Sequence, residues 1–262
     1  MVHCVALLAS LVPAHESSTK NLQLHKCSTQ DCGLIKFPIK KLAETFQDPS
    51  WEPGDWTSTA WDISPLRRKY ILPGKLKLAN DAQEFVAFSH VWSDGTGVGV
   101  NKQGVVNRCL AEFWGKIAQR LGCHAFWWDT VCVPVEKEPR RKSLNVMLHN
   151  FSRAKYTVIH DKGLIKIPWT SGGSAVVAIT LSTWFTRAWT AAELYSNRSK
   201  EDSVKVLFRN ANPGILEPEI KDLRKDILSY DTGIPALAHL NAMNIIREVF
   251  DDVYNITILR RY

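Results

Sequence analysis

The chain has 262 residues, of which 45% are hydrophobic and 10% aromatic; these values exclude a disordered or fibrous protein and predict one large globular domain or one domain with extensions. The formal net charge of +7 favours contact with anions, but the densest basic runs, 67–69 and 140–142, are each only three residues long. Because no long basic tract is interleaved with aromatic residues, we expect a solvated basic surface and no nucleic-acid partner, and nucleic-acid binding stays the weaker hypothesis.

Residues 1–80 predict a loop-rich N-terminal extension that packs on a main domain at 81–262. Polar, Pro-containing stretches dominate it, and hydrophobic periodicity is weak outside 5–12 and 36–46. The apolar run Met1–Leu11 lacks a basic leader and is too short to span a bilayer. We expect this run to form a helix against the domain, with a signal peptide as the alternative, and we expect no membrane partner.

The six Cys residues favour a reducing, cytoplasmic compartment. Cys109, Cys123 and Cys132 lie inside apolar stretches, where a free thiol behaves as a small hydrophobic group. A metal site is the alternative for Cys27 and Cys32, but these two residues lack the paired CxxC spacing of a zinc module. We therefore expect no bound metal and no bound cofactor.

From Glu84 onward the sequence pattern predicts short buried strands that alternate with amphipathic helices. Phe85–His90 is an apolar run that ends in a polar, Gly-rich loop at 93–99, which is typical of a buried strand followed by a loop. Apolar residues then recur at helical spacing over 106–121 and stop at Gly122. The other expected elements are a strand at 125–129, a helix from Pro139 to Phe151, a strand at 155–160, a helix ending near 181, a helix at 184–197, a strand at 204–208, and helices near 216–229 and 235–249.

This alternation predicts an α/β fold in which a parallel sheet is flanked by helices on both faces. In such sheets a ligand binds outside the carboxyl ends of the strands. The loops that follow Ser89, Asp129 and His160 should therefore meet at one edge of the sheet.

Four segments carry a recognisable series of motifs. Residues 85–95 read as an apolar strand followed by Ser-His-Val-Trp-Ser-Asp-Gly, and 126–134 read Phe-Trp-Trp-Asp-Thr-Val-Cys-Val-Pro. A helix with basic residues and Met at 141–147, and then Ala154, follows; residues 184–193 read Trp-Phe-Thr-Arg-Ala-Trp-Thr-Ala-Ala-Glu. In this order the four segments resemble the motifs of the HET (heterokaryon incompatibility) domain family.

The resemblance covers roughly residues 84–210 and departs from the family pattern at Trp128 and Phe151, neither of which is a polar position. HET domains are similar to TIR domains in fold, so the resemblance implies a TIR/flavodoxin-like parallel sheet. Residues 189–194 also resemble the Trp-Cys-x-x-Glu-Leu segment of TIR domains, whose Glu serves NAD glycohydrolysis in the catalytic members. The resemblance therefore implies that Glu193 is a catalytic residue.

As a HET-type protein the chain is expected to be a fungal cell-death effector of non-self recognition. The expected partners are a nucleotide-type small molecule, further copies of the chain on activation, and an upstream non-self sensor protein. NAD is the expected substrate and not a bound cofactor. A non-catalytic signalling module that acts by homotypic assembly is the alternative.

The chemistry of Glu193 is compatible with this role. Trp189 lies four residues earlier and shares a helix face with Glu193, so poor solvation of the carboxylate should raise its pKa. Nicotinamide leaves as a neutral base, so the reaction needs only stabilisation of an oxocarbenium-like transition state, which one carboxylate can supply. The alternative for Glu193 is a surface carboxylate paired with Arg187 or Arg198.

Several further residues are candidates for ligand binding, each with a structural alternative. Trp92 can stack on a base or pack in the core, and most of the ten Trp residues are expected in the core. Asp94 opens a Gly-rich loop that can approach a phosphate or act as a plain connection. Asp129 can contact a ribose hydroxyl or orient loops, and Arg187 can bind phosphate or clamp Asp129 or Glu193. The expected ligand-binding residues are Ser89, His90, Trp92, Asp94, Asp129, Arg187 and Trp189.

Overall fold

The structure, a computed structural model, describes residues 33–48, 59–67, 76–94, 104–170, 174–196, 200 and 202–228. Its strands are β1 (Leu34–Lys36), β2 (Trp61–Asp62), β3 (Phe85–His90), β4 (Val105–Asn107), β5 (Ala125–Trp127), β6 (Tyr156–His160), β7 (Val204–Phe208) and β8 (Glu219–Asp222). Its α-helices are α2 (Ile39–Gln47), α3 (Arg108–Arg120), α4 (Asp129–Cys132), α5 (Lys137–Asn145), α6 (Met147–Arg153), α7 (Ser174–Thr180) and α8 (Ala188–Tyr195). Short 3-10 turns occupy Ser64–Arg67, Trp92–Asp94 and Leu164–Lys166, and one turn of π-helix occupies Leu223–Leu228.

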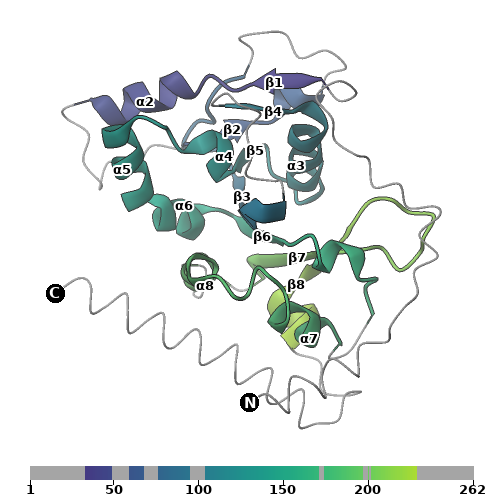
Figure 1. Ribbon diagram of the computed structural model, residues 1–262. Helices are drawn as coiled ribbons and strands as arrows, with labels where there is room; N and C mark the ends of the chain where they lie inside the picture. Colours follow the sequence, from purple (N-terminus) through teal and green to yellow (C-terminus); the bar gives the residue numbers. More distant parts are fainter. Residues whose placement is uncertain are drawn as a thin grey trace, which may run out of the picture.

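A six-stranded mixed sheet in the order β2-β5-β3-β6-β7-β8 forms the centre of the fold (Figure 1). Strands β5, β3, β6 and β7 run parallel, and the outer strands β2 and β8 pair antiparallel to them. Counted in chain order the parallel strands follow the order 2-1-3-4, which is that of a flavodoxin-like doubly wound sheet. The expected α/β fold is confirmed, and its topological switch point lies between β3 and β6.

Helices cover both faces of this sheet. Trp114 of α3 packs on Phe88 of β3, with ring centroids 4.2 Å apart, and Phe151 of α6 packs on Trp127 of β5, with centroids 5.2 Å apart. Helix α3 lies on one side of the strands in Figure 1, and α6 and α8 lie on the other. All residues of β3 are buried, as expected for a parallel strand with helices on both faces.

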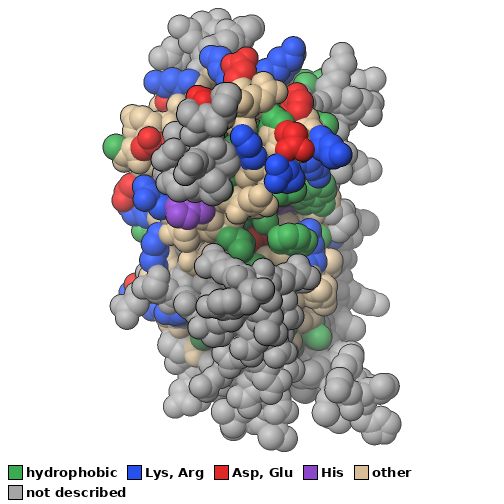
Figure 2. Space-filling view, turned by 90° about the vertical axis from the view of Figure 1, so that its left-hand side faces the viewer, with side chains coloured by type: hydrophobic (Ala, Val, Ile, Leu, Met, Phe, Trp, Pro, Cys, Tyr) green, Lys and Arg blue, Asp and Glu red, His purple; other side chains and the backbone are tan. Residues whose placement is uncertain are grey.

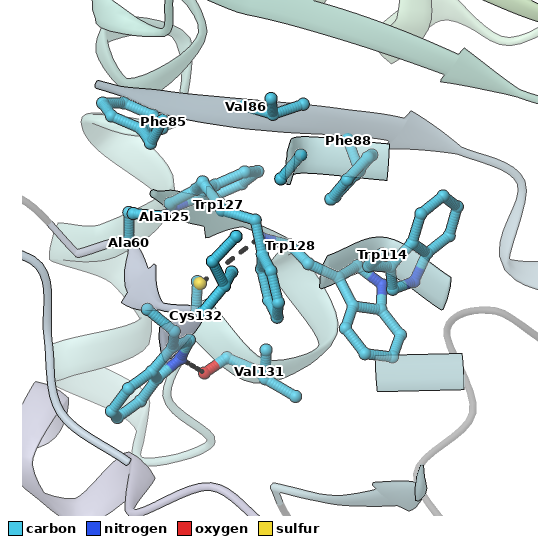
Figure 3. Close-up of a cluster of buried hydrophobic side chains, with 14 of the residues drawn as sticks. Ala60, Phe85, Val86, Phe88, Trp114, Ala125, Trp127, Trp128, Val131 and Cys132 are labelled. Carbon is cyan, nitrogen blue, oxygen red and sulfur yellow. Dashed lines mark hydrogen bonds between the residues drawn. The ribbon is translucent and has the colours of Figure 1, made fainter. Parts of the chain in front are cut away.

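Large aromatic side chains fill much of the core, as Figure 3 shows around Trp114, Trp127 and Trp128. Together with Trp61 and Trp184 these are among the largest fully buried side chains of the protein. The expectation of a Trp-rich core is therefore confirmed for these five residues.

Indole N–H groups are hydrogen-bond donors, and those of Trp61 and Trp127 find partners in the core. The Trp61 Nε1–H donates to the carbonyl of Val131 at 2.9 Å, and the Trp127 Nε1–H donates to the hydroxyl of Thr59 at 3.0 Å. Both bonds join the segment around 59–61 to the sheet and its helices.

The described residues before 81 supply part of the fold. Strand β2 extends the main sheet at β5, and β1 pairs antiparallel with β4 in a separate two-stranded sheet. Gly104, which precedes β4, has φ +70°, and a Cβ atom there would lie 2.7 Å from the carbonyl oxygen of Phe37. Only glycine allows this close approach, because the left-handed backbone and the short contact both exclude a side chain.

Three expectations about the helices are wrong. The region near 216–229 contains strand β8 and a turn of π-helix, because its backbone pairs with β7. The helix expected over 139–151 breaks at Val146 into α5 and α6. The helix expected over 184–197 begins only at Ala188, and residues 184–187 form a turn.

Two further expectations concern loops and termini. Asp129 is the first residue of the short helix α4, whereas it was expected to be the last residue of the preceding strand. The helix expected at 235–249, the run Met1–Leu11, and Cys27 and Cys32 lie outside the described residues.

Candidate functional site

The candidate site lies at the carboxyl ends of β3 and β6, at the topological switch point, where doubly wound sheets bind ligands. His90 and His160 are direct neighbours there in the parallel pairing. Successive side chains of a strand point to opposite faces, so Ser89 and His90 project to different sides of the sheet. The expected residues therefore form two clusters, one on each face.

The first cluster joins Ser89 to α8. The Ser89 hydroxyl donates to Oε2 of Glu193 at 2.5 Å, and the Trp184 Nε1–H donates to the Ser89 hydroxyl at 2.6 Å. Ser89 and Trp184 are buried, and Glu193 is partly buried. The Ser89 hydroxyl thus accepts one hydrogen bond from Trp184 and donates another to Glu193.

The environment of Glu193 favours its protonated form. Burial raises its pKa to about 8, and the nearby negative charge of Asp129 acts in the same direction. The hydrogen bond from Ser89 and the positive charge of Arg187 oppose this increase. The expected rise in pKa is confirmed, and a carboxyl group that titrates near neutrality is typical of catalytic sites.

Trp189, which was expected to share a helix face with Glu193, is itself largely exposed. Its side chain is 60% exposed, whereas Thr190 and Leu194 are buried and mark the centre of the packed face of α8. Glu193 lies four residues after Trp189, on the same side of the helix, and is more buried than Trp189.

The second cluster holds Asp129 at the other face. Oδ1 of Asp129 lies 2.6 Å from Nε2 of His90, and Oδ2 accepts the Trp92 Nε1–H at 2.7 Å. Although burial opposes it, the charge and hydrogen bond of His90, together with the bond from Trp92, lower the pKa of Asp129. Asp129 is therefore the ionised member of this site, and it fixes the ring positions of both neighbours.

Arg187 connects the two clusters. Its Nη1–H donates to the backbone carbonyl of His90 at 2.8 Å, so the guanidinium lies at the end of β3. From there its charge lowers the pKa of Glu193. The contact with a carbonyl was not among the expected alternatives, which had Arg187 bind a phosphate, Asp129 or Glu193.

Asp94 links the two strand-end loops. Its Oδ2 accepts the backbone N–H of Lys162 at 2.6 Å, and burial raises its pKa. Asp94 therefore joins the loop after β3 to the loop after β6. The glycines at 95–99 that were expected to approach a phosphate lie outside the described residues.

Exposed aromatic surface borders the site. The Trp92 side chain is 46% exposed although its N–H is fixed on Asp129, so Trp92 is not a core residue. Its ring is held in place and remains accessible on part of its surface, which suits the stacking role expected for it.

Three residues at this edge were not among the expected site residues. Trp184 and Asp161 hydrogen-bond into the first cluster, and His160 lies beside His90. Burial lowers the pKa of His160 to about 4, and its Nδ1 has no hydrogen-bond partner among the described residues. Asp161 could have been predicted from the sequence, because it follows a predicted strand, as Asp94 does.

Charge is distributed without a single dominant patch on the visible face. Figure 2 shows Lys and Arg side chains interspersed with Asp and Glu, as expected for a solvated surface. Within the described ranges no helix is long and apolar enough to cross a membrane, and no group of three or more His, Cys, Asp or Glu side chains is arranged to hold a metal ion.

Comparisons with protein-family models, curated proteins and solved structures gave no match to this chain.

Proposed function

We propose that this protein is a HET-type, TIR-like cell-death effector of fungal non-self recognition that hydrolyses NAD or a related nucleotide through Glu193. One observation carries the proposal: the Glu193 carboxyl group, hydrogen-bonded to Ser89, lies at the switch point of a doubly wound sheet and titrates near neutrality. This is the place where such sheets bind nucleotides.

The reaction needs little from the protein beyond electrostatics. Water forms a bond to the anomeric carbon of the ribose while the bond to nicotinamide breaks. Nicotinamide leaves as a neutral base with the bonding electron pair, and one proton passes to the solvent. Positive charge develops on the ribose, and the ionised carboxylate of Glu193 stabilises it.

The raised pKa of Glu193 selects for a cationic substrate. At pH 7 a carboxyl group with a pKa of about 8 is mostly protonated. A positively charged nicotinamide ring nearby favours the ionised form and lowers this pKa. NAD thus promotes the protonation state that its own cleavage requires, whereas NADH, whose reduced ring is neutral, does not.

The neighbouring residues complete the proposed ligand site. Trp92 stacks on an aromatic ring of the nucleotide, because its indole is anchored on Asp129 and partly exposed. Arg187 uses one guanidinium N–H on the His90 carbonyl, and its other donors bind a phosphate oxygen. Activation involves an upstream sensor protein and assembly of several copies of the chain.

A non-catalytic assembly module is the second candidate, and the exposure of Trp189 favours it. A large aromatic side chain that is 60% exposed on α8 is suited to a contact between copies. In this case the bond between Ser89 and Glu193 serves only to attach α8 to β3.

The direct test is to incubate concentrated protein with NAD and to follow nicotinamide release. We expect Glu193→Gln and Glu193→Ala to reduce the rate by a factor of about 100 or more, since each removes the charge that stabilises the transition state. Glu138→Gln, at an exposed glutamate of α5 that pairs with Arg141, is the matched control and should retain the wild-type rate.

Two results would contradict the proposal. Release that both Glu193 variants leave unchanged would remove Glu193 from the mechanism. Absence of release at every protein concentration, with toxicity in cells retained by Glu193→Ala, would favour the assembly module.

A further inference from the structure

Asp161, directly after β6, uses its two carboxylate oxygens for different partners. Oδ1 accepts the backbone N–H groups of Gly163 and Leu164, at 2.6 and 3.1 Å, and so fixes the turn after the strand. Oδ2 accepts the backbone N–H of Trp184 at 2.9 Å, from a segment 23 residues later in the chain. Asp161 is only 2% exposed, so both sets of bonds are shielded from water.

The residue that Asp161 holds is the one that reaches Ser89. With its backbone anchored, Trp184 places its indole N–H 2.6 Å from the Ser89 hydroxyl, which in turn donates to Glu193. The Thr190 hydroxyl also lies 2.7 Å from the Trp184 carbonyl, so the turn is attached to the start of α8. Asp161 is therefore the first residue in a series of hydrogen bonds that ends at the Glu193 carboxylate.

We propose that Asp161 is a positioning residue that sets the location and the ionisation of Glu193 through Trp184 and Ser89. Its role in catalysis rests on the function proposed above, whereas its effect on Glu193 can be measured in the absence of NAD. Asp161 does not touch the proposed site of reaction and acts only through the residues that it holds.

The need for a carboxylate, and not an amide, follows from the donors around it. An Asn at this position can keep one oxygen acceptor for Gly163 and Leu164. Its NH₂ group then meets the N–H of Trp184, and two donors cannot form a hydrogen bond. Asp161→Asn thus preserves volume and removes one interaction, the one that leads to Glu193.

Within the described ranges, the charged groups that act on Glu193 include Asp129 from α4 and Arg187 at the start of α8, and the Ser89 hydroxyl donates a hydrogen bond to it. Asp161→Asn does not alter Asp129 or Arg187 directly. A looser Trp184 weakens the hydrogen bond that stabilises the Glu193 carboxylate. The pKa of Glu193 should therefore rise further.

The experiment measures the titration of Glu193 by NMR of its ¹³C-labelled side-chain carboxyl group in the full-length protein without NAD. We expect Asp161→Asn to move the midpoint upward by about one pH unit, and Trp184→Phe, which removes the indole N–H through which Asp161 acts, to move it at least as far in the same direction. The pH dependence of nicotinamide release should shift upward with it.

The matched control is Asp222→Asn. Asp222 is the buried last residue of β8, accepts the N–H groups of Arg224 and Lys225 on Oδ1, and pairs with Lys205 through Oδ2. Its substitution should lower the melting temperature without changing the titration of Glu193.

The inference is overturned if the Glu193 midpoint in Asp161→Asn is unchanged or lowered while the melting temperature falls as in Asp222→Asn. If Asp161→Asn does not fold, an unchanged midpoint in Trp184→Phe overturns it equally. A shifted midpoint in a protein that never cleaves NAD would reject the enzymatic function alone.

Discussion

Two carboxyl groups at the end of β3 differ in protonation although they influence each other electrostatically. Burial raises the pKa of Glu193 to about 8. Burial acts in the same direction on Asp129, but the contacts with His90 and Trp92 outweigh it and lower the pKa. Neighbouring acids with pKa values driven apart are a recurrent feature of sites that perform acid–base or electrostatic catalysis.

The coupling of the two groups gives a prediction at this scale. Because the charge of Asp129 raises the pKa of Glu193, Asp129→Asn should lower the titration midpoint of Glu193 and move the pH profile of NAD cleavage toward lower pH. Carboxyl ¹³C NMR across pH 5–10 checks this. An unchanged midpoint would mean that the clusters on the two faces of the sheet are electrostatically independent.

Among the elements, those with strong local patterns were predictable from the sequence. The buried run Phe85–His90 and the run 204–208 are strands as expected, and the periodic helix over 106–121 exists, although its first residues pair as β4. These patterns reflect burial on one or both faces, which is a property of the local sequence.

The elements that were not predictable depend on distant partners. Residues 184–187 form a turn because the Trp184 N–H is bound by Asp161 and its carbonyl by Thr190. Strand β8 exists because its backbone pairs with β7, although its sequence has the spacing of a helix. The same holds for the site. Ser89, His90 and Asp94 could be predicted because they lie at or after the end of a predicted strand. Their division into two clusters could not, because it depends on contacts between distant parts of the chain.

The junction between β1 and β4 depends on Gly104, and this gives a prediction for an element. Gly104→Ala should destabilise the protein by at least about 1–2 kcal/mol, because alanine disfavours φ +70° and its Cβ would meet the Phe37 carbonyl oxygen. Gly33→Ala is the control, with φ +64° but no atom within 4 Å of the added Cβ. Urea unfolding compares the two, and equal losses would exclude the close contact as a cause.

At the scale of the whole molecule, the buried His160 and the partly buried Glu193 limit stability at opposite ends of the pH range. His160 has a folded pKa of about 4 against an ordinary value of 6.5, so the unfolded chain binds the extra proton between these values. Glu193 has a folded pKa of about 8 against 4.5, so the folded protein binds the extra proton in that window. Stability therefore falls as pH decreases below 6.5 because of His160, and falls as pH increases from 4.5 to 8 because of Glu193.

Thermal or urea unfolding as a function of pH should separate the two contributions. His160→Phe, which keeps a ring against Trp114, should remove the acid-dependent decrease in the free energy of unfolding, which amounts to up to about 3 kcal/mol near pH 4. Glu193→Gln should remove the decrease in stability between pH 4.5 and 8 and make the protein more stable than wild type at pH 8. If Glu193→Gln is less stable than wild type at pH 8, the pKa of Glu193 in the folded protein is lower than about 8.

The adjacency of Ser89 and His90 has a consequence for how this protein can change in evolution. Their side chains serve opposite faces of β3, so the site depends on the parity of the strand. One residue inserted between Phe85 and Ser89 would present the hydroxyl to α3 and the imidazole to Glu193, and would disrupt both clusters at once. Two inserted residues would restore the parity. Strand β3 should therefore tolerate insertions or deletions only of an even number of residues.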